Sequence, residues 1–429
     1  MEPDEIIVNP HAKIIPALGD KIASSRDRGS IDRLVVSAPL RGRPLTKHVI
    51  KKDADRELFD LFYEILAAGG DLELELTDAQ EEYLLRIGFL APQRRIPETV
   101  RYSCFLDAGD FAELSVRPSP PPSDRLIVNP SLLFVDIGAA LEPLQNRVLF
   151  TDRFLSGHPM LWIEDPGTSV LAPYWVRGRT IDVAKSLIPG APAPSNLDPE
   201  TERCFRAADI LVPEDHRERR AAEVERALDE ARSQHAERGY GLLRDLIPPL
   251  QIAAMRRHYR QLIENGHVPL GDNQVEKRYF LHDERIAAFW HRQLGSVMSH
   301  VAGRPVKPSY VYFAQYEPGA VLERHTDRIQ AEYTLSVQVA YEPALEPGEK
   351  TPWPIFVDAK GTCQRSGLHA DEPRSAPSPK TAELRLAIGE ALFYRGHELP
   401  HYRNELPAGN RSTSLFFHYV HADFEGSLR

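Results

Sequence analysis

The chain has 429 residues, which is more than one typical domain contains, and we expect two or three domains. Its formal net charge is −10, which argues against the phosphate backbone of a nucleic acid as the main partner. No apolar run approaches the roughly 18 residues that a membrane helix needs, and the acidic start lacks the apolar core of a secretory signal. The three cysteines, Cys104, Cys204 and Cys363, match no zinc site or disulfide framework. We therefore predict a cytoplasmic protein without a membrane partner.

Two short phrases recur in the first half of the chain. Ile7-Val-Asn-Pro10 returns 120 residues later as Ile127-Val-Asn-Pro130. The segment from Leu76 to Pro92 is matched 121 residues later by the segment that ends at Pro213. The same order and the nearly equal offset predict a tandem repeat whose period is too long for a solenoid. Coincidence is the alternative, because Asn-Pro and an apolar residue before Pro are common in turns.

Each expected copy, roughly residues 6–95 and 126–216, begins with a β-like apolar run and closes with a helix and a short apolar strand. Thr77 and Asp198 are the expected caps of the closing helices. The first copy adds an amphipathic helix from Asp55 to Ala67. This order of elements is winged-helix-like. The closing segment of the first copy resembles the end of small peptide-binding winged-helix domains attached to peptide-modifying enzymes, and a packing or dimerisation module is the alternative.

The connecting stretches suggest where the domains end. A stretch rich in Pro and Ser, from Arg117 to Ser123, predicts a stiff extended linker. The run after Pro213 is dense in charges of both signs and predicts a largely solvated helix. The expected organisation is residues 1–116 for the first copy, 117–125 for the linker, 126–216 for the second copy, 217–238 for the charged linker helix and 239–429 for the last domain.

The last domain begins with helices and continues with strands. A short strand near Leu242 precedes two expected helices, from about Pro249 to Asn265 and from Asp283 to Val301. From Lys307 onward the apolar period becomes alternating. The expected strands are Ser309 to Tyr316, Tyr333 to Tyr341, Trp353 to Val357, Ala382 to Ala387, Glu390 to Tyr394 and Ser412 to Val420. This pattern predicts an α+β fold with an antiparallel double-sheet barrel and helices on one side.

A metal site is predicted from the triplet His325-Thr-Asp327. On extended chain, residues two apart point to the same side, so one imidazole and one carboxylate are presented together. These groups are two thirds of a 2-His-1-carboxylate iron site, and either His397 or His401 can supply the third ligand. Arg411 follows His401 by ten residues, and Thr413 lies on the same face of the strand. An arginine and a hydroxyl so placed suit a grip on a carboxylate.

The order of these motifs resembles that of the Fe(II)- and 2-oxoglutarate-dependent dioxygenases, particularly their prolyl-hydroxylase-like branch. The resemblance spans about Gly239 to the end of the chain. It implies a double-stranded β-helix, or jelly roll, with Fe(II), 2-oxoglutarate and O2 as cofactors and co-substrates. The residues that it assigns are His325, Asp327 and His401 as the metal ligands of the catalytic centre, Arg411 with Thr413 for the distal carboxylate of 2-oxoglutarate, and Tyr312 as a further contact.

The resemblance also implies a reaction, in which an unactivated C–H is hydroxylated while succinate and CO2 form. Relatives that halogenate replace the carboxylate ligand by a small residue, and the retained Asp327 therefore favours hydroxylation. The expected substrate is a peptide, a protein or an amino-acid-like molecule. The alternatives are a hydroxylase of small metabolites whose first half forms a homodimer, and a catalytically silent jelly-roll binding protein. A nucleic-acid demethylase is disfavoured by the acidic balance and by the lack of a basic and aromatic strip.

Several other residues compete with these assignments. His369 and Asp371 form a second His-x-Asp, but they lie in an insertion rich in Pro and Ser and are interpreted as a solvated loop. His418 and His421 alternate with apolar residues on the last strand, which favours packing groups or neighbours of the ligands. Tyr310 and Tyr316 are interpreted as core tyrosines with satisfied hydroxyls.

Overall fold

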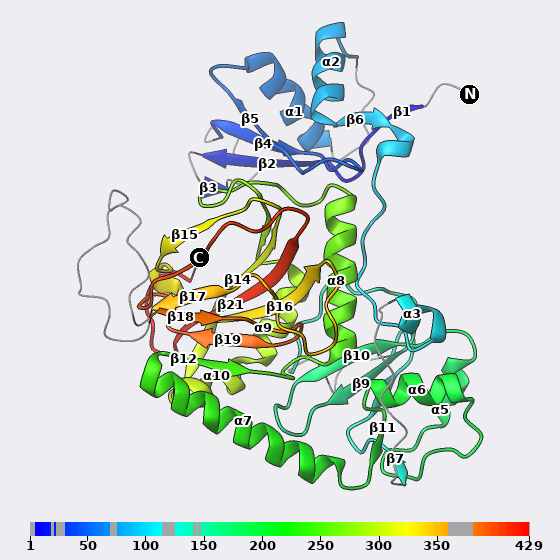
Figure 1. The fold of residues 1–429 in the computed structure, drawn as a ribbon. Coiled ribbons are helices and arrows are strands. Elements are labelled where there is room, and N and C mark those ends of the chain that lie inside the picture. Colours follow the sequence, from blue (N-terminus) through cyan, green and yellow to red (C-terminus); the bar gives the residue numbers. More distant parts are fainter. Residues whose placement is uncertain are drawn as a thin grey trace. The chain divides into compact units, whose positions relative to one another are not determined.

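The computed structural model describes residues 5–18, 21–22, 31–68, 75–113, 125–139, 144, 147–358 and 381–428. The chain forms two compact units, Met1–Val100 with Tyr259–Leu270 and Arg101–His258 with Gly271–Arg429, each described here by itself (Figure 1). The expected second copy thus shares a unit with the expected last domain. The Pro-rich stretch, the insertion with His369 and Asp371, and Cys363 lie outside the described residues.

The first unit is built on a four-stranded antiparallel sheet in the order β3-β2-β4-β5. Phe59 and Phe62 of one helix and Leu84 of another bury their side chains against Leu34 and Ile50 of this sheet. The strands of this sheet are β2 (Lys13–Leu18), β3 (Lys21–Ile22), β4 (Arg33–Ser37) and β5 (Lys47–Lys51), and the helices are α1 (Arg56–Ala68) and α2 (Asp78–Ile87). A separate ladder joins β1 (Ile6–Val8) to β6 (Leu90–Pro92). A 3-10 turn, η1 (Gln93–Arg95), follows β6.

The expected helix caps are confirmed. Thr77 Oγ1 accepts a hydrogen bond from the Gln80 backbone N–H at 3.3 Å, and the Gln80 side chain accepts one from the Thr77 N–H at 2.9 Å, which completes a capping box. Asp198 caps its helix by accepting hydrogen bonds from the backbone N–H groups of Glu200 and Thr201. These bonds satisfy amide groups that the first turn of a helix leaves without a partner.

Residues 126–216 contain a terminal two-stranded ladder, as the first unit does, but their sheet has three described strands where that of the first unit has four. A two-stranded ladder pairs β7 with β11, a three-stranded sheet has the order β10-β9-β8, and two helices follow. The bounds are β7 (Leu126–Val128), β8 (Leu133–Val135), β9 (Met160–Glu164), β10 (Leu171–Trp175), α5 (Thr180–Ser186), α6 (Pro199–Ala207) and β11 (Leu211–Pro213), and α3 (Ala108–Glu113) precedes them.

The two Asn-Pro phrases make matching contacts in the two segments. The Asn9 side-chain amide donates to the Gly88 carbonyl at 3.1 Å, and the Asn129 amide donates to the Asp209 carbonyl at 2.8 Å. Each asparagine oxygen also accepts a hydrogen bond from the backbone N–H two residues further on. Each asparagine thus ties a strand end to the turn after a helix, which explains why the same phrase stands at both places.

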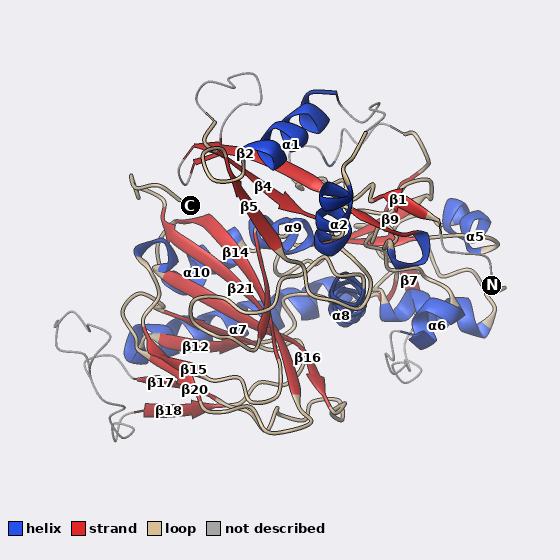
Figure 2. Ribbon diagram, turned by 90° about the horizontal axis from the view of Figure 1, so that it is seen from above, coloured by secondary structure: helices blue, strands red, loops and turns tan. Residues whose placement is uncertain are grey.

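The second unit contains two antiparallel sheets with a core between them. The larger has the order β12-β19-β16-β21-β14-β13, and the smaller has the order β15-β20-β17-β18. Tyr316 of the large sheet packs with Leu322 of the small one, and Tyr394 packs with Ile355. Figure 2 shows β14, β21 and β16 side by side in the large sheet. The predicted α+β class and jelly-roll fold are confirmed by this arrangement.

The strands of the two sheets, in chain order, are β12 (Tyr240–Leu243), β13 (Arg278–His282), β14 (Val306–Tyr316), β15 (Leu322–His325), β16 (Tyr333–Glu342), β17 (Ile355–Asp358), β18 (Thr381–Leu384), β19 (Ala391–Tyr394), β20 (His401–Arg403) and β21 (Arg411–His421). The short 3-10 turn η2 (Ile329–Ala331) precedes β16. Strand β13 is not among the expected strands, and it matters because it carries three residues of the cavity described below, Arg278, Phe280 and His282.

Helices contact the face of the large sheet that points away from the small one. Helix α7 (His216–Arg238) contacts β12, and helices α9 (Arg285–Gln293) and α10 (Gly295–Ala302) contact β14. The residues of α8 (Pro249–Glu264) are divided between the two units. The single helix expected from Asp283 to Val301 is therefore wrong. The chain breaks at Leu294 and Gly295, where glycine has a low helix propensity. Among the described residues, no helix combines the length and apolar character needed to cross a bilayer.

Buried His291 on α9 makes the stability of this unit dependent on pH. Its Nε2–H donates to the His418 carbonyl at 2.7 Å, and burial lowers the pKa of the imidazole to about 3. In the unfolded chain a histidine has a pKa of about 6.5. The unfolded state therefore binds more protons between these values, so stability that is present above pH 6.5 is lost as the pH falls.

We expect His291→Gln to flatten this dependence. Between pH 6.5 and pH 4.5, the free energy of unfolding of the wild type should fall more steeply than that of the variant, by about 1.4 kcal/mol per pH unit. Denaturant unfolding at several pH values measures both slopes. Tyr419→Phe is the matched control. It removes the hydroxyl that donates to the His291 carbonyl at 3.0 Å, but it changes no group that titrates in this pH range. Equal slopes for the wild type and His291→Gln would contradict the expectation.

Candidate metal centre and active-site cavity

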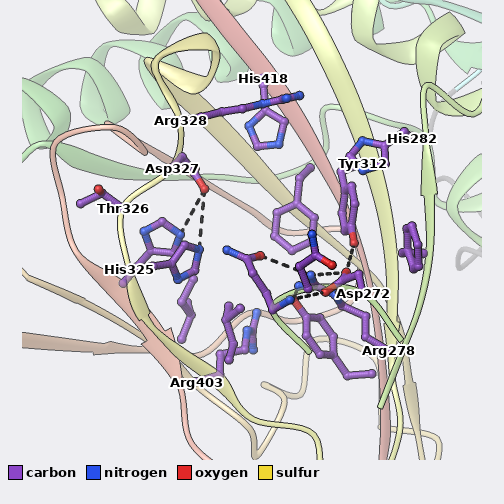
Figure 3. Close-up of a pocket in the computed structure, with 18 of the residues that line it drawn as sticks. Asp272, Arg278, His282, Tyr312, His325, Thr326, Asp327, Arg328, Arg403 and His418 are labelled. Atoms are coloured by element: carbon purple, nitrogen blue, oxygen red, sulfur yellow. Dashed lines mark hydrogen bonds and ion pairs between the residues drawn. The ribbon is translucent and has the colours of Figure 1, made fainter. Parts of the chain in front are cut away.

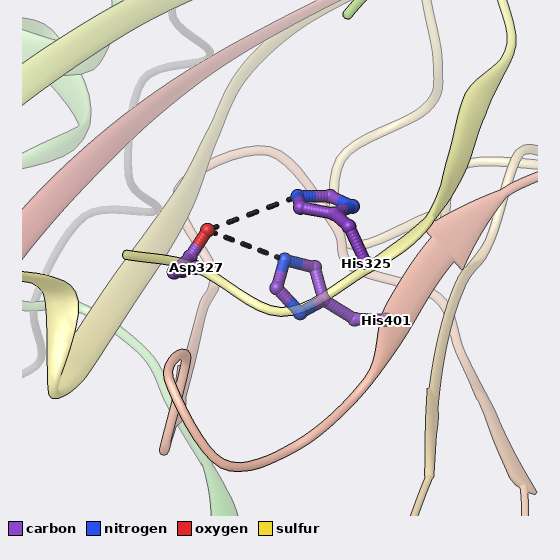
Figure 4. Close-up of side chains that lie close together, drawn as sticks. All are labelled: His325, Asp327 and His401. Carbon is purple, nitrogen blue, oxygen red and sulfur yellow. Dashed lines mark ion pairs between the residues drawn. The ribbon is translucent and has the colours of Figure 1, made fainter. Parts of the chain in front are cut away.

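Three potential metal ligands converge where the small sheet ends. His325 is the last residue of β15, Asp327 follows it, and the register of the ladder places His401 of β20 directly opposite His325. Their donor atoms all lie within 4.8 Å of one another. Asp327 Oδ1 is 3.8 Å from His325 Nε2 and 3.7 Å from His401 Nε2 (Figure 4). An antiparallel pair of histidines and a carboxylate two residues along the chain thus form one face of a coordination site.

Both imidazoles are oriented by the backbone. His325 Nδ1 lies 2.8 Å from the Glu323 carbonyl, and His401 Nδ1 lies 3.0 Å from the Leu399 carbonyl. A carbonyl oxygen can only accept, so each Nδ1 carries a proton and each Nε2 is the ring nitrogen that faces the Asp327 carboxylate. Histidines that bind metals are commonly fixed in this way by a hydrogen bond from the other ring nitrogen.

Asp327 is held by a chain of hydrogen bonds from the large sheet. Thr334 of β16 donates its hydroxyl proton to Asp327 Oδ2 at 2.8 Å, and His418 Nδ1 lies 3.1 Å from the same hydroxyl oxygen. Because threonine has one hydroxyl proton, His418 must donate to Thr334. The Asp327 backbone N–H donates to the Gly396 carbonyl at 2.8 Å, and a Cβ at Gly396 would overlap the Asp327 carboxylate. The space beside the carboxylate thus requires glycine.

The site's protonation suits a cation. Burial and the neighbouring His401 lower the pKa of His325 to about 4, so its imidazole is neutral at pH 7. Burial raises the pKa of Asp327, but the His401 and His418 imidazoles outweigh this effect, and the net pKa lies below the ordinary value. The carboxylate is therefore ionised and the imidazole unprotonated, which are the forms that bind a metal. Two imidazole nitrogens and one carboxylate fit Fe(II) with positions left open.

The rival histidine lies elsewhere. His397 is exposed, and its Nδ1 lies 3.0 Å from the Asp327 backbone carbonyl rather than beside the carboxylate. The structure therefore brings His401, and not His397, together with His325 and Asp327.

A cavity of about 630 Å³ opens beside the three ligands (Figure 3). Its volume lies within the range of small-molecule sites. Aromatic side chains supply much of its wall, and its charged lining residues are Asp272, Asp327, Arg278, Arg328 and Arg403.

Arg403 is the buried cation of this cavity. It follows His401 by two residues on β20, so both side chains point to the same side of the strand. The residue is 2% exposed, and its guanidinium donates to the Trp353 carbonyl at 3.0 Å and lies over the Trp353 ring. Its Nε has no hydrogen-bond partner, and no carboxylate in the described part of the chain pairs with it. Burial lowers the pKa of Arg403. A buried guanidinium without a counter-charge is costly, which points to an anionic ligand.

Arg411 and Thr413 are not placed in the cavity. Arg411 pairs with Glu317 and Glu342 at 2.9 Å each, and its side chain is 50% exposed. Thr413 donates to the Gln315 side chain at 3.3 Å. The cavity is lined instead by Phe416 and His418 of the same strand. The register of β21 sets Arg411 opposite Glu342 at the strand's beginning, so the structure does not bring Arg411 together with the three potential ligands.

Tyr312 does line the cavity, but its hydroxyl is engaged by protein. It donates to Asp272, whose carboxylate also pairs with Arg278, with Nε–Oδ2 at 2.9 Å. The Asp272 carboxylate is thus occupied by a tyrosine and an arginine. Asp272 and Arg278 are missing from the sequence-based set, because Asp272 lies in the segment before β13 and the strand that carries Arg278 is short. Arg403 is also missing from the sequence-based set, although its position two residues after His401 indicates that both side chains point to the same side of a strand.

Several solved structures are similar to part of this chain. No protein-family model and no curated protein matches the chain. Similar solved structures include the non-heme alpha-ketoglutarate-dependent epimerase SnoN from nogalamycin biosynthesis (14% identity, TM-score 0.37, 46% of this chain and 84% of that one). Others are a Pseudomonas putida prolyl-4-hydroxylase (13%, 0.34, 45% and 98%) and Streptomyces hygroscopicus HygX with nickel and 2-oxoglutarate bound (11%, 0.36, 46% and 87%). The similarity covers a little under half of this chain.

Proposed function

We propose that the chain is an iron- and 2-oxoglutarate-dependent oxygenase in which His325, Asp327 and His401 hold Fe(II). The observation that carries this proposal is the convergence of two fixed Nε2 atoms and one ionised carboxylate on the wall of a cavity. When bound, iron would supply the activation of dioxygen that couples decarboxylation of 2-oxoglutarate to oxidation of a substrate C–H.

Arg403 is proposed as the residue that binds the distal carboxylate of 2-oxoglutarate. It lines the same cavity as the ligands, is buried, and offers a guanidinium whose planar donors match a carboxylate. The co-substrate's anion would neutralise a charge that is otherwise unpaired in the described residues. A catalytic zinc ion takes a similar set of ligands, so the dependence of turnover on iron separates the two metals.

The other residues of the chain position these groups. Thr334 and Gly396 fix the carboxylate of Asp327, and the carbonyls of Glu323 and Leu399 fix the two imidazoles. Aromatic walls keep the cavity apolar around the open side of the site, which strengthens charge interactions inside it. We propose hydroxylation of a peptide or amino-acid-like substrate, supported by the complete carboxylate-containing ligand set.

Residues 6–95 and 126–216 are further proposed to be diverged copies of one helix-and-strand module. The matching ladders and the matching asparagine contacts support this proposal. Its function is proposed to be recognition of the substrate peptide or dimerisation.

Iron-dependent succinate formation tests the enzymatic proposal. We expect the wild type with Fe(II), 2-oxoglutarate and a set of candidate peptides and metabolites to form succinate and a product heavier by one oxygen, measured by mass spectrometry. His325→Ala should lower the rate by at least about 100-fold, since losing a direct ligand costs more than losing its outer partner. His397→Ala is the matched control and should retain activity. Succinate formation by His325→Ala at the wild-type rate would contradict the site, and its absence from iron-loaded wild type would favour a silent binding protein.

A further inference from the structure

A second arginine of the cavity, Arg328, has no carboxylate partner among the described residues. It follows the ligand Asp327 directly in the chain and lines the cavity. Unlike Arg403, Arg328 is exposed, which places its guanidinium where an entering molecule can reach it. Figure 3 shows its side chain extending past His418 on the same side of the cavity.

Aromatic stacking holds this guanidinium in place. The Arg328 guanidinium carbon lies 3.9 Å from the centroid of the Tyr310 ring. Tyr310 in turn stacks on His418 with a centroid separation of 4.1 Å and an interplanar angle of 27°. His418 donates to Thr334, and Thr334 donates to Asp327. The cation is therefore linked to the metal's carboxylate ligand through a continuous set of contacts, so its distance from the reaction centre is fixed by the fold.

The formal charges of the lining residues indicate which charge a substrate should carry. Arg278 is neutralised by Asp272 through their ion pair. The other aspartate and arginine residues of the lining are Asp327, Arg403 and Arg328. The formal charges of the proposed Fe(II) and of doubly charged 2-oxoglutarate sum to zero, and so do those of Asp327 and Arg403. One positive charge, that of Arg328, is left beside the space for the substrate.

We propose that the substrate carries an anionic group, a carboxylate or a phosphate, that Arg328 binds while the adjoining part of the molecule lies against the aromatic wall. The inference rests on the proposed oxygenase function and names the substrate class of that site. The wall next to this anion site includes Phe280, Tyr310 and Tyr312, with Phe280 and Tyr312 stacked at 6.0 Å. An arginine whose planar guanidinium is fixed by stacking suits recognition of a carboxylate or a phosphate, because little side-chain entropy is lost on binding.

Small aromatic probes test this assignment. The protein is loaded with Fe(II) and 2-oxoglutarate without oxygen, and binding of benzoate, phenyl phosphate and benzamide is measured by calorimetry. Benzamide is nearly the same shape as benzoate but uncharged. We expect the anions to bind at least about tenfold more tightly than benzamide, as for a charge-assisted hydrogen bond. In Arg328→Gln the preference should fall to within about twofold, since the charge is gone. The tighter of the two anions identifies the recognised group.

Controls separate this inference from the function on which it rests. Arg385→Gln makes the same chemical change at an exposed arginine that pairs with Glu383 outside the cavity, and it should keep the preference for anions. The affinity for 2-oxoglutarate, measured first on every sample, should stay unchanged in Arg328→Gln. Absence of 2-oxoglutarate binding in the wild type would overturn the oxygenase proposal. Normal 2-oxoglutarate binding with no benzoate binding, with equal affinities for benzoate and benzamide, or with an unchanged preference in Arg328→Gln would overturn the anion site alone.

Discussion

Replacing Arg403 by glutamine should weaken the binding of 2-oxoglutarate by about 100-fold. A charge-assisted pair of hydrogen bonds between a buried guanidinium and a carboxylate contributes up to about 3 kcal/mol, which corresponds to this change in affinity. Calorimetric titration of the iron-loaded protein in the absence of oxygen measures the dissociation constant directly. The variant should fold, because glutamine removes a buried charge that has no counter-ion among the described residues.

Two further variants sharpen this test. Arg403→Lys keeps the charge but loses the planar pair of donors, so its affinity should lie between those of the wild type and the glutamine variant. Arg411→Gln is the matched control, since Arg411 pairs with Glu317 and Glu342 at the surface and should leave the affinity unchanged. A large loss of affinity in Arg411→Gln with none in Arg403→Gln would restore the anchor expected from the sequence and overturn Arg403.

Introducing one methyl group at Gly396 should release the metal. In Gly396→Ala, the new Cβ would overlap Asp327 Oδ2 and Thr334 Oγ1, and the Ala331 carbonyl lies 3.0 Å away on another side. The carboxylate must therefore move from its place between the two imidazoles. Disturbing the partners of a metal ligand typically costs 10–100-fold in affinity, and we expect about 100-fold because the ligand itself is displaced. Competition of Fe(II) against a chelator measures the loss.

Gly295→Ala is the matched control for this variant. A Cβ at Gly295 meets no atom within 4 Å, so the same substitution should leave metal affinity unchanged and should not weaken α10. Thermal unfolding without metal checks that Gly396→Ala still folds. If its iron affinity equals that of the wild type, the carboxylate of Asp327 is not a ligand held by this contact.

Local patterns in the sequence predict the elements that carry the ligands. Alternation around His325 and Asp327 depends only on extended backbone, and the structure places both groups together with His401. The helix caps at Thr77 and Asp198 are likewise local, since each depends on residues within three positions. The break between α9 and α10 is not predicted because apolar periodicity continues across Leu294, whose side chain is fully buried.

Contacts between distant strands could not be predicted from the spacing of residues. The spacing of ten between His401 and Arg411 says nothing about Glu317 and Glu342, which come from two other segments and hold Arg411 at the surface. Recognising Arg403 as a cavity residue required its burial and its missing counter-charge, neither of which is visible in sequence. The short strand β13 has too few residues to show a clear apolar period, and Arg278 is therefore not predicted as a cavity residue.

The segment from Gly396 to Arg403 contributes to two proposed binding sites, one for iron and one for 2-oxoglutarate. Gly396 leaves room for the Asp327 carboxylate, His401 is a proposed metal ligand, and Arg403 is the proposed anchor of the co-substrate. All three stand within eight consecutive residues, so a shift of this short segment disturbs retention of iron and capture of 2-oxoglutarate together. The proposed substrate contacts, Arg328 and the aromatic wall, come from other segments of the chain, so substitutions there leave the sequence of this segment unchanged.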